Sequence, residues 1–307
     1  MRKGRRNPQG LLTMQASDLF AQWRHLCDSG LNNRAAAGRL GVSEAKLVAS
    51  GCGTISKRLL PDARAILEAA RRLGAAKFVV RNDFAVLERA GAISRISVRQ
   101  DPLEVRAASL QLQIAPGKVA AAFALLEPRE QGTKRSLQLF DAAGVTVLKL
   151  VFREQSDDDF NRVVNPLLHS SQTVDETVDP EPRPARAEPA PRPRAALGEF
   201  LQCAARLGVP LEIQVSNSGA SVQARVPIQR VKRSERALWI NVLDPGLDLH
   251  LWEERICTAR AEAESRDCGS LRWIADNGVT AFSVRAARGF EALSQAARAN
   301  DLLLHPC

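Results

Sequence analysis

The sequence predicts an α+β fold built from two tandem copies of an antiparallel β-sheet with flanking helices, and an extra N-terminal helical block in the first copy. Three observations support this prediction: two blocks of sequence repeat at one offset, several stretches alternate apolar and polar residues, and a proline-rich stretch divides the chain. The chain has 307 residues, about twice the usual length of a domain, as a duplication requires.

The repeat is visible in two separate blocks. Gly74 ends a segment that aligns with the segment ending at Gly208, and Gly144 aligns in the same way with Gly278; both pairs lie 134 residues apart. Asn82 and Asn217 follow the first block at similar spacing. A shared offset over about eighty residues indicates two copies of one fold.

Each copy contains the same predicted elements in the same order. A first helix ends at a Leu-Gly pair, where glycine suits a left-handed cap. Strands follow, because apolar residues alternate with polar ones at 110–114, 211–215 and 247–251. Hairpin turns are predicted at 141–144 and 275–278, and closing helices near 157–168 and 289–300. Ser156 and Asp159 have capping-box spacing, so the acidic run there is read as a helix start.

The chain divides into four predicted segments. Residues 1–14 form a disordered extension, 15–169 the first copy with its helical block, 170–196 a linker and 197–301 the second copy. Six prolines between 180 and 193 alternate with charged and small residues, which favours an extended tether. The helical block has no counterpart in the second copy, since the first copy's closing segment and the linker occupy the equivalent positions.

Composition excludes several classes of protein. An apolar share of 45% and a charged share of 25% are typical of a globular protein, and no run is long enough for a membrane span. Tyrosine is absent, and the six cysteines form no zinc-binding pattern and are read as reduced thiols. With no credible leader peptide, whether translation starts at Met1 or Met14, we expect a cytoplasmic protein without a membrane partner.

A helix-turn-helix-like segment and the distribution of histidines and carboxylates bear on nucleic-acid binding and on catalysis. Residues 34–48 resemble a helix-turn-helix, but the second helix lacks side chains suited to reading base edges. We therefore expect a helical hairpin packed on the sheet, and no sequence-specific binding of nucleic acid. The four histidines are widely separated and the carboxylates form no pairs, so no catalytic residue is assigned.

Three stretches together resemble the HemS/ChuX class of haem-utilisation proteins. They are Leu40–Gly51, Arg135–Gly144 and Trp239–Leu251, and the resemblance extends from about residue 17 to 297. It implies two copies of an antiparallel sheet with helices, haem held in a cleft, and a role in receiving, delivering or degrading haem inside bacteria.

The sequence departs from the family where haem would bind. The resemblance implies that a helical block just after the linker supplies an axial histidine for the iron. In this sequence that block is missing. Residues 80–88 keep Arg81 and Asn82 but have apolar residues at two family histidine positions. Gln113 replaces a strand arginine, and Trp252 replaces the arginine that the resemblance aligns with it in the second half. These changes imply altered or weakened iron ligation.

The resemblance and the chemistry of haem leave four candidate residues. Haem needs an apolar slot, an iron ligand and cations for its propionates. Arg81, Asn82, His250 and His169 are the candidates for binding it, with His169 or His250 as the iron ligand. Each also has an ordinary interpretation: Arg81 as an exposed strand-end residue, His250 as a structural residue on the opposite sheet face, and His169 as an exposed histidine.

The predicted function is haem binding or haem handling, with haem or a similar apolar anion as the partner. A haem-degrading enzyme and a haem-free interaction or regulatory module are the alternatives. The second copy's uncovered sheet would expose apolar surface, which would favour a homodimer.

Overall fold

The computed structural model describes residues 16–97, 101–108, 110–173, 196–208, 210–234, 239–264, 268–286 and 288–299. The extension predicted at 1–14 and most of the linker predicted at 170–196 lie outside these residues. The limits of the four predicted segments therefore stay predictions.

The first copy begins with three helices and continues as a sheet with two covering helices. In chain order its elements are α1 (Ala16–Asp28), α2 (Asn33–Leu40), α3 (Glu44–Ala49), β1 (Ser56–Leu59), α4 (Ala63–Leu73), β2 (Ala75–Arg81), β3 (Ala85–Ser97), β4 (Leu103–Ala107), β5 (Leu110–Ile114), the short helix η1 (Pro116–Lys118), β6 (Ala121–Arg129), β7 (Gly132–Phe140), β8 (Thr146–Phe152), α5 (Asp157–Val164) and η2 (Asn165–Leu167). Ser156 caps α5, its hydroxyl accepting a hydrogen bond from the Asp159 amide, as predicted.

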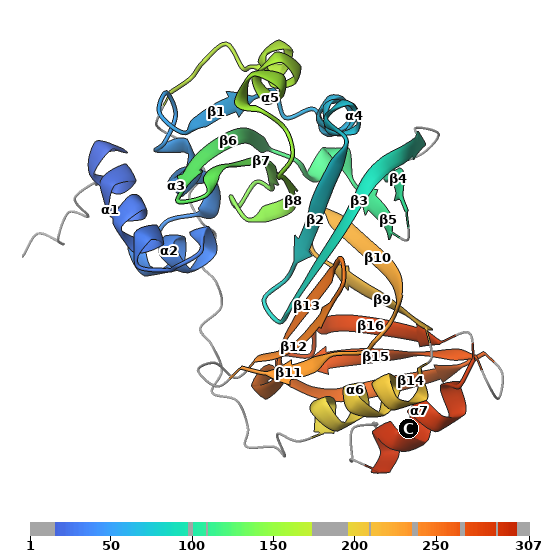
Figure 1. Ribbon diagram of the computed structural model, residues 1–307. Coiled ribbons are helices and arrows are strands. Elements are labelled where there is room, and N and C mark those ends of the chain that lie inside the picture. The colour runs from blue at the N-terminus through green and yellow to red at the C-terminus, as the bar shows by residue number, and fades with distance from the viewer. Residues whose placement is uncertain are drawn as a thin grey trace, which may run out of the picture.

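The second copy repeats the order from α4 to α5 and adds the short strand β11; its described residues include no counterpart of the opening helices or of β1. Its elements are α6 (Ala196–Leu207), β9 (Pro210–Ser216), β10 (Ala220–Pro227), β11 (Val231–Arg233), β12 (Trp239–Asp244), β13 (Leu247–Trp252), η3 (Glu253–Arg255), β14 (Ile256–Ala263), β15 (Gly269–Ala275), β16 (Thr280–Ala286) and α7 (Phe290–Ala299). The predicted α+β fold of two copies with antiparallel sheets and flanking helices is confirmed (Figure 1).

The strands form two sheets that share the long strand β3. The first sheet has the order β1-β6-β7-β8-β2-β3-β13-β12-β11, and the second has the order β3-β4-β5-β10-β9-β16-β15-β14. Residues 85–92 of β3 pair in the first sheet and residues 93–97 pair with β4 in the second. Each copy thus adds a hairpin to the other copy's sheet: β12–β13 extends the first, and β4–β5 extends the second.

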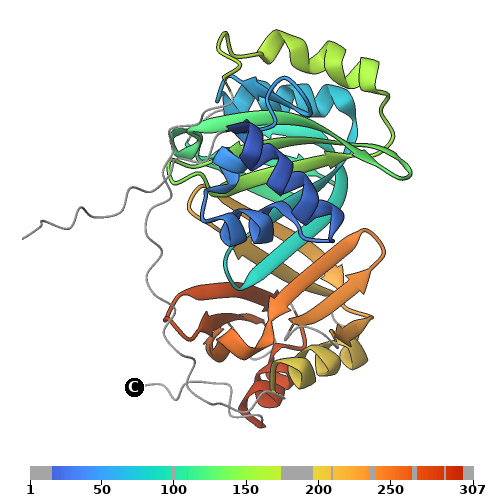
Figure 2. The ribbon, with the colours of Figure 1, turned by 90° about the vertical axis from the view of Figure 1, so that its left-hand side faces the viewer.

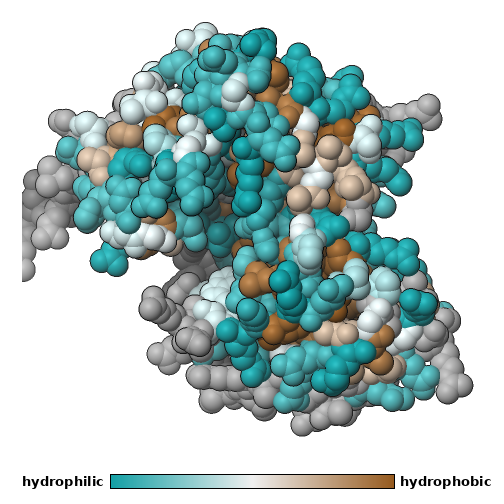
Figure 3. All heavy atoms as spheres, in the orientation of Figure 1, coloured by the Kyte–Doolittle hydropathy of each residue, from teal (hydrophilic) through white to brown (hydrophobic). Residues whose placement is uncertain are grey.

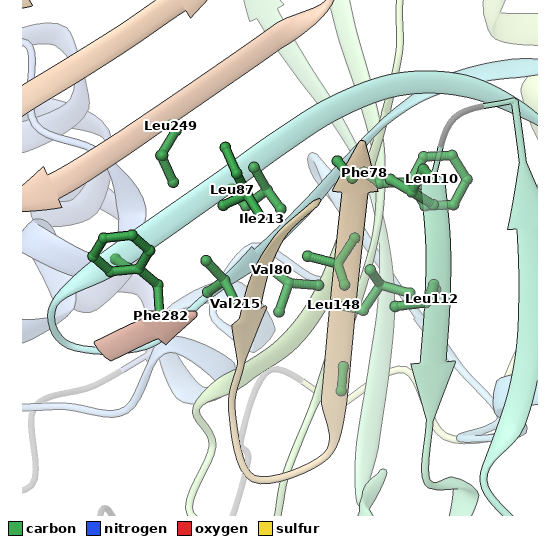
Figure 4. Packing of buried hydrophobic residues seen from close by; sticks show 14 of the residues in the cluster. Phe78, Val80, Leu87, Leu110, Leu112, Leu148, Ile213, Val215, Leu249 and Phe282 are labelled. Carbon is green, nitrogen blue, oxygen red and sulfur yellow. The ribbon is translucent and has the colours of Figure 1, made fainter. Parts of the chain in front are cut away.

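The apolar faces of the two sheets meet in one core. Leu87 and Leu249 from the first sheet and Ile213 and Val215 from the second belong to a single buried cluster. Figure 4 shows these side chains lying together between the two sheets. Helices α4 and α5 cover the rest of this face in the first copy, and α6 and α7 do so in the second.

Two asparagines at equivalent positions join the copies. The Asn82 amide donates to the carbonyl oxygens of Ser216 and Ala281 at 3.0 and 2.8 Å. The Asn217 amide donates to those of Arg81 and Val147 at 3.1 and 2.9 Å. Each side-chain oxygen also accepts two backbone amides of its own turn. Since a primary amide has two donor hydrogens and two acceptor sites, both side chains are fully used.

Helices α1, α2 and α3, called the helical block below, pack on the first sheet. They lie in front of the sheet strands in Figure 2. The Ala45 amide donates to the Gly144 carbonyl oxygen at 3.0 Å, and a Cβ on Gly144 would lie 2.5 Å from the Ser43 hydroxyl. Five of the six residues of α3 are buried, so this helix packs as the predicted helical hairpin. At the equivalent Gly278 nothing lies within 4 Å of such a Cβ.

None of the helices in the described part of the chain is both long and apolar enough to cross a membrane.

Candidate functional site

The candidate site lies on the outer face of the first sheet, over β8, β2, β3, β13 and β12. We call it the composite face, because both copies contribute strands to it. Alternation decides which side chains reach it: Phe78 and Val80 of β2 are buried beneath α4, so Val79 and Arg81 point the other way. The same rule places Val86 and His250 on the composite face.

Arg81 and His250 lie on either side of one residue. Arg81 pairs with Val86 across β2–β3, and His250 pairs with Val86 across β3–β13. Two strand spacings separate their backbones by about 9–10 Å. The structure therefore brings together two of the four predicted site residues, which are 169 residues apart in the sequence.

His250 has the hydrogen bond that a metal-binding histidine needs. Its Nδ1 lies 2.6 Å from the side-chain oxygen of Asn241, the residue opposite it on β12. An amide oxygen only accepts, so Nδ1 carries the proton and the Nε2 lone pair of the neutral ring is left for a ligand. The ring is partly exposed. Such a second partner fixes ring orientation in metal sites.

A pair of tryptophans forms an aromatic wall beside His250. Trp239 and Trp252 are opposite each other on β12 and β13, two residues from Asn241 and His250, and so share their face. Their rings stack with centroids 5.8 Å apart and an interplanar angle of 19°. Both rings are partly exposed, and the Arg255 guanidinium lies 5.3 Å from the centroid of the Trp252 ring. Trp239 therefore presents aromatic surface suited to a planar apolar ligand, beside a ring that also contacts a cation.

Lys149 is a second cation on this face, which sequence reasoning missed. It pairs with Val79 across β2–β8, so it is the diagonal neighbour of Arg81 at about 7–8 Å. Burial, to whose effect the charge of Lys134 adds, lowers the pKa of Lys149 to about 8. Among the described residues it makes no hydrogen bond or ion pair. A lone lysine in the apolar strand 146–152 is the signal that could have identified it.

A neutralised acidic pair adjoins the site. Lys77 donates to Glu88 at 2.9 Å and to Asp248 at 2.6 Å. Burial acts to lower the pKa of Lys77, but these two hydrogen bonds outweigh it and the pKa is raised. The carboxylates are therefore engaged and repel an anion at Arg81 less than free carboxylates would.

A polar chain ties the helical block to one end of the composite face. The Thr146 hydroxyl donates to Glu44 at 2.9 Å, Glu44 accepts from Arg34 at 3.3 Å, and Arg34 also binds Asp83 in the β2–β3 turn. Arg34 and Glu44 are only 12% and 10% exposed. Figure 3 shows the surface hollowed between this block and the strands of the second copy.

The other two candidates, His169 and Asn82, are not placed to bind a ligand on the composite face. His169 follows the bridge between Leu59 and Leu168 at the far edge of the first sheet, and its ring accepts a hydrogen bond from the Ser171 amide. Five strand spacings separate that edge from β3. Asn82 is at the composite face's end, but its side chain has no hydrogen-bonding capacity left for a ligand. The described residues contain no cluster of metal-ligating side chains.

Strand register corrects one alignment. Counted from the equivalent asparagines Asn82 and Asn217, Val86 of the first copy corresponds to Ser221 of the second. His250 pairs with Val86, and Gln113 pairs with Ser221. His250 is therefore the counterpart of Gln113, and Trp252 is the counterpart of Ala115. By the same register, Ser216 stands where the first copy has Arg81, and Ser283 where it has Lys149.

The equivalent face of the second sheet is called the polar face. Apart from the paired Pro210 and Pro227 at one end, its described side chains over β4, β5, β10 and β9 are polar or charged: Glu104, Arg106, Gln111, Gln113, Glu212, Gln214, Ser216, Ser221, Gln223 and Arg225. This corrects the expected apolar surface, since residues exposed by the missing helices are hydrophilic. The physical reason given for a homodimer is therefore not met on this face.

The composite face combines three chemical functions. It has an imidazole nitrogen oriented by Asn241, two neighbouring cations at Arg81 and Lys149, and aromatic surface at Trp239 and Trp252. An apolar planar molecule with two carboxylates and a metal centre needs this set. The residues present therefore fit haem as a ligand.

Sequence comparison identifies one domain and two curated relatives. The model of the haemin-degrading HemS.ChuX domain matches residues 41–167. The hemin transport protein HmuS of Yersinia pestis is 35% identical over 119 residues, and HemS of Yersinia enterocolitica is 34% identical over the same length. These alignments cover 38% of this chain and 34% of each relative, so the chain matches about a third of their length.

Structure comparison covers nearly the whole chain. Holo-PhuS, a heme-binding protein from Pseudomonas aeruginosa, matches with a TM-score of 0.79 and 25% identity over 94% of this chain and 99% of that one. The heme-degrading enzyme ChuS of Escherichia coli O157:H7 matches with a TM-score of 0.78 and 21% identity over 94% and 100%. The second match shows a shared fold.

Proposed function

We propose that this chain, whose residues 41–167 match the HemS.ChuX domain, binds and hands on haem, and that the composite face holds it. His250 ligates the iron through Nε2, Arg81 and Lys149 receive the propionates, and Trp239 and Trp252 contact the macrocycle. The observation that carries this proposal is the meeting of Arg81 and His250 around Val86.

The name of the matching domain includes haemin degradation, but the individual proteins with higher sequence identity favour haem binding. The matches at 25% identity or more are a heme-binding protein and hemin transport proteins. The degrading enzyme lies at 21%, where likeness supports the fold alone. The histidine that resemblance implies after the linker is replaced in our proposal by a strand histidine from the second copy, so ligation is altered.

A reducing compartment fits this role. All five cysteines in the described ranges are free thiols, as a cytoplasmic protein requires. We propose that the protein receives haem there and passes it to a partner that binds it more tightly.

The test is a haemin titration of the full chain followed by absorbance. We expect one saturable site per chain. In His250→Ala we expect a weaker Soret band and a lower affinity for haemin. His169→Ala is the matched control, because His169 lies at the opposite sheet edge, and it should behave as the unaltered chain. Retention of the full spectrum in His250→Ala with its loss in His169→Ala would overturn the proposed ligand.

The same sample separates carrier from enzyme. Loss of the Soret band on adding ascorbate under air would indicate degradation of bound haem, and a stable band would indicate a carrier. We expect the band to persist, with transfer of haem to added apomyoglobin at a measurable rate.

A further inference from the structure

The polar face contains a cavity at the seam between the copies. It has a volume of about 310 Å³ and lies among Arg106 and Gln111 of the first copy and Glu212, Gln223 and Arg225 of the second. These side chains share one face, because Arg106 pairs with Gln111, Gln111 with Gln223, and Arg225 with Glu212.

The cavity's single carboxylate is already engaged. Glu212 accepts a hydrogen bond from the Gln223 amide at 3.0 Å and lies 3.7 Å from the Arg285 guanidinium. Arg285 itself pairs with Glu264 at 2.7 Å, and Arg272 pairs with Glu262. Carboxylates thus neutralise the other arginines of this neighbourhood in the way that is usual for a protein surface.

Arg106 and Arg225 differ from those arginines. Within the described ranges neither guanidinium group makes a hydrogen bond or an ion pair. They stand two strands apart, with backbones about 10–12 Å from each other, and arginine side chains are long enough to meet over Gln111 and Gln223. Two guanidinium groups and two side-chain amides therefore surround one small space with an excess of positive charge.

The register shows that this charge is opposite to that of the equivalent cluster in the first sheet, which is Lys77 with Glu88 and Asp248. Glu212 is the counterpart of Lys77, Gln223 of Glu88 and Gln111 of Asp248. The first sheet thus has one lysine between two carboxylates, where the second sheet has one carboxylate between two amides and, in addition, Arg225 and Arg106. The lining has no aromatic ring and no imidazole. The site therefore lacks what haem requires and has what an oxyanion requires.

We propose that this cavity binds a small hydrophilic anion, a phosphate group or a dicarboxylate, clamped by Arg106 and Arg225. Guanidinium groups bind such oxyanions through paired N–H···O bonds, and Gln111 supplies further donors from its amide. The ligand is distinct from haem, and its binding does not require His250.

The test is calorimetric titration of the full chain with inorganic phosphate and, separately, with succinate, at constant ionic strength set by sodium chloride. We expect one saturable site for at least one probe, and the probe that binds identifies the source of the anion. Arg106→Gln and Arg225→Gln should each weaken binding at least tenfold, because each removes a charged hydrogen-bonding partner.

Arg260→Gln is the matched control. Arg260 is exposed on the same sheet in β14 but lies outside the cavity, so its loss should change affinity less than twofold. His250→Ala should also bind the anion normally, which separates this site from the proposed haem site. Absence of saturable binding by both probes, or an equal loss in Arg260→Gln, would overturn the proposal.

Discussion

The composite face and the polar face occupy equivalent positions in two copies of one fold, yet their chemistry differs. The composite face has Arg81, Lys149 and His250 where the polar face has Ser216, Ser283 and Gln113. Only the first is bordered by the helical block. The backbone has been conserved between the copies while the ligand class that each face suits has changed, so a duplicated scaffold does not imply a duplicated site.

The largest expected effect concerns the junction that keeps the copies equivalent. Asn82→Ala and Asn217→Ala should each lower the free energy of unfolding by about 3 kcal/mol, because each leaves two carbonyl oxygens of the other copy without a donor. Urea unfolding followed by circular dichroism measures both. A loss below about 1 kcal/mol in either variant would contradict the symmetric role given to the two side chains.

The next prediction uses two glycines with the same backbone and different surroundings. Gly144 and Gly278 have φ of 70° and 81°, so alanine is strained at either position. Gly144→Ala must also displace Ser43 of the helical block, which adds about 2 kcal/mol of overpacking. We expect Gly144→Ala to be less stable than Gly278→Ala by that amount in thermal unfolding. Equal losses would mean that the helical block is not docked at this turn.

The buried charge of Lys149 should lower the stability of the folded protein while it strengthens the binding of haem. Its pKa is about 8 in the folded protein against 10.5 for an ordinary lysine, so the unfolded chain binds more protons between these values. Stability therefore rises with pH from about 8 to 10.5, and the full cost of the buried charge is present below pH 8.

Removing that charge gives the corresponding variant test. Lys149→Met should stabilise the protein at pH 7 by about 1–3 kcal/mol, flatten this pH dependence and weaken haem binding. Unfolding curves from pH 7 to about 10.5 check the first two effects, and a haemin titration checks the third. A variant that is less stable at pH 7 and keeps the slope would remove Lys149 from this account.

The smallest effect is on haem affinity alone. Arg81→Ala should weaken haemin binding about tenfold, or about 1.4 kcal/mol, through loss of one charged hydrogen bond to a propionate. Ser216→Ala, at the equivalent position of the second copy, should leave the affinity unchanged. Absorbance titrations of both variants make the comparison, and an unchanged affinity in Arg81→Ala would place the propionates elsewhere.

Much of the fold could be predicted from local patterns. The alternating leucines of β5 and β13, the cap at Ser156 and the shared offset of Gly74 and Gly208 all act within a few residues of where they are read. The exchange of hairpins could not be predicted in this way, because pairing of β13 with β3 depends on contacts between the copies and leaves no local signal.

Only part of the candidate site could be predicted, again because its assembly depends on contacts between distant strands. Arg81 and His250 could be named from resemblance, but their proximity depends on the register of β13 on β3. The stacking of Trp239 on Trp252 depends on the register of β12 on β13, and the place of Lys149 beside Arg81 depends on that of β8 on β2. The polar face, in contrast, could have been read from Gln111 and Gln113, which alternate with buried leucines and so must face outward.

The most direct test of the divergence between the two faces is a haemin titration of two variants altered at equivalent positions, one on each face. His250→Gln gives the composite face the residue that the polar face has at this position, and Gln113→Ala alters the polar face at its counterpart. We predict that His250→Gln loses the saturable site while Gln113→Ala keeps one haem per chain. The reverse result, with binding intact in His250→Gln and lost in Gln113→Ala, would place haem on the second copy and contradict the account.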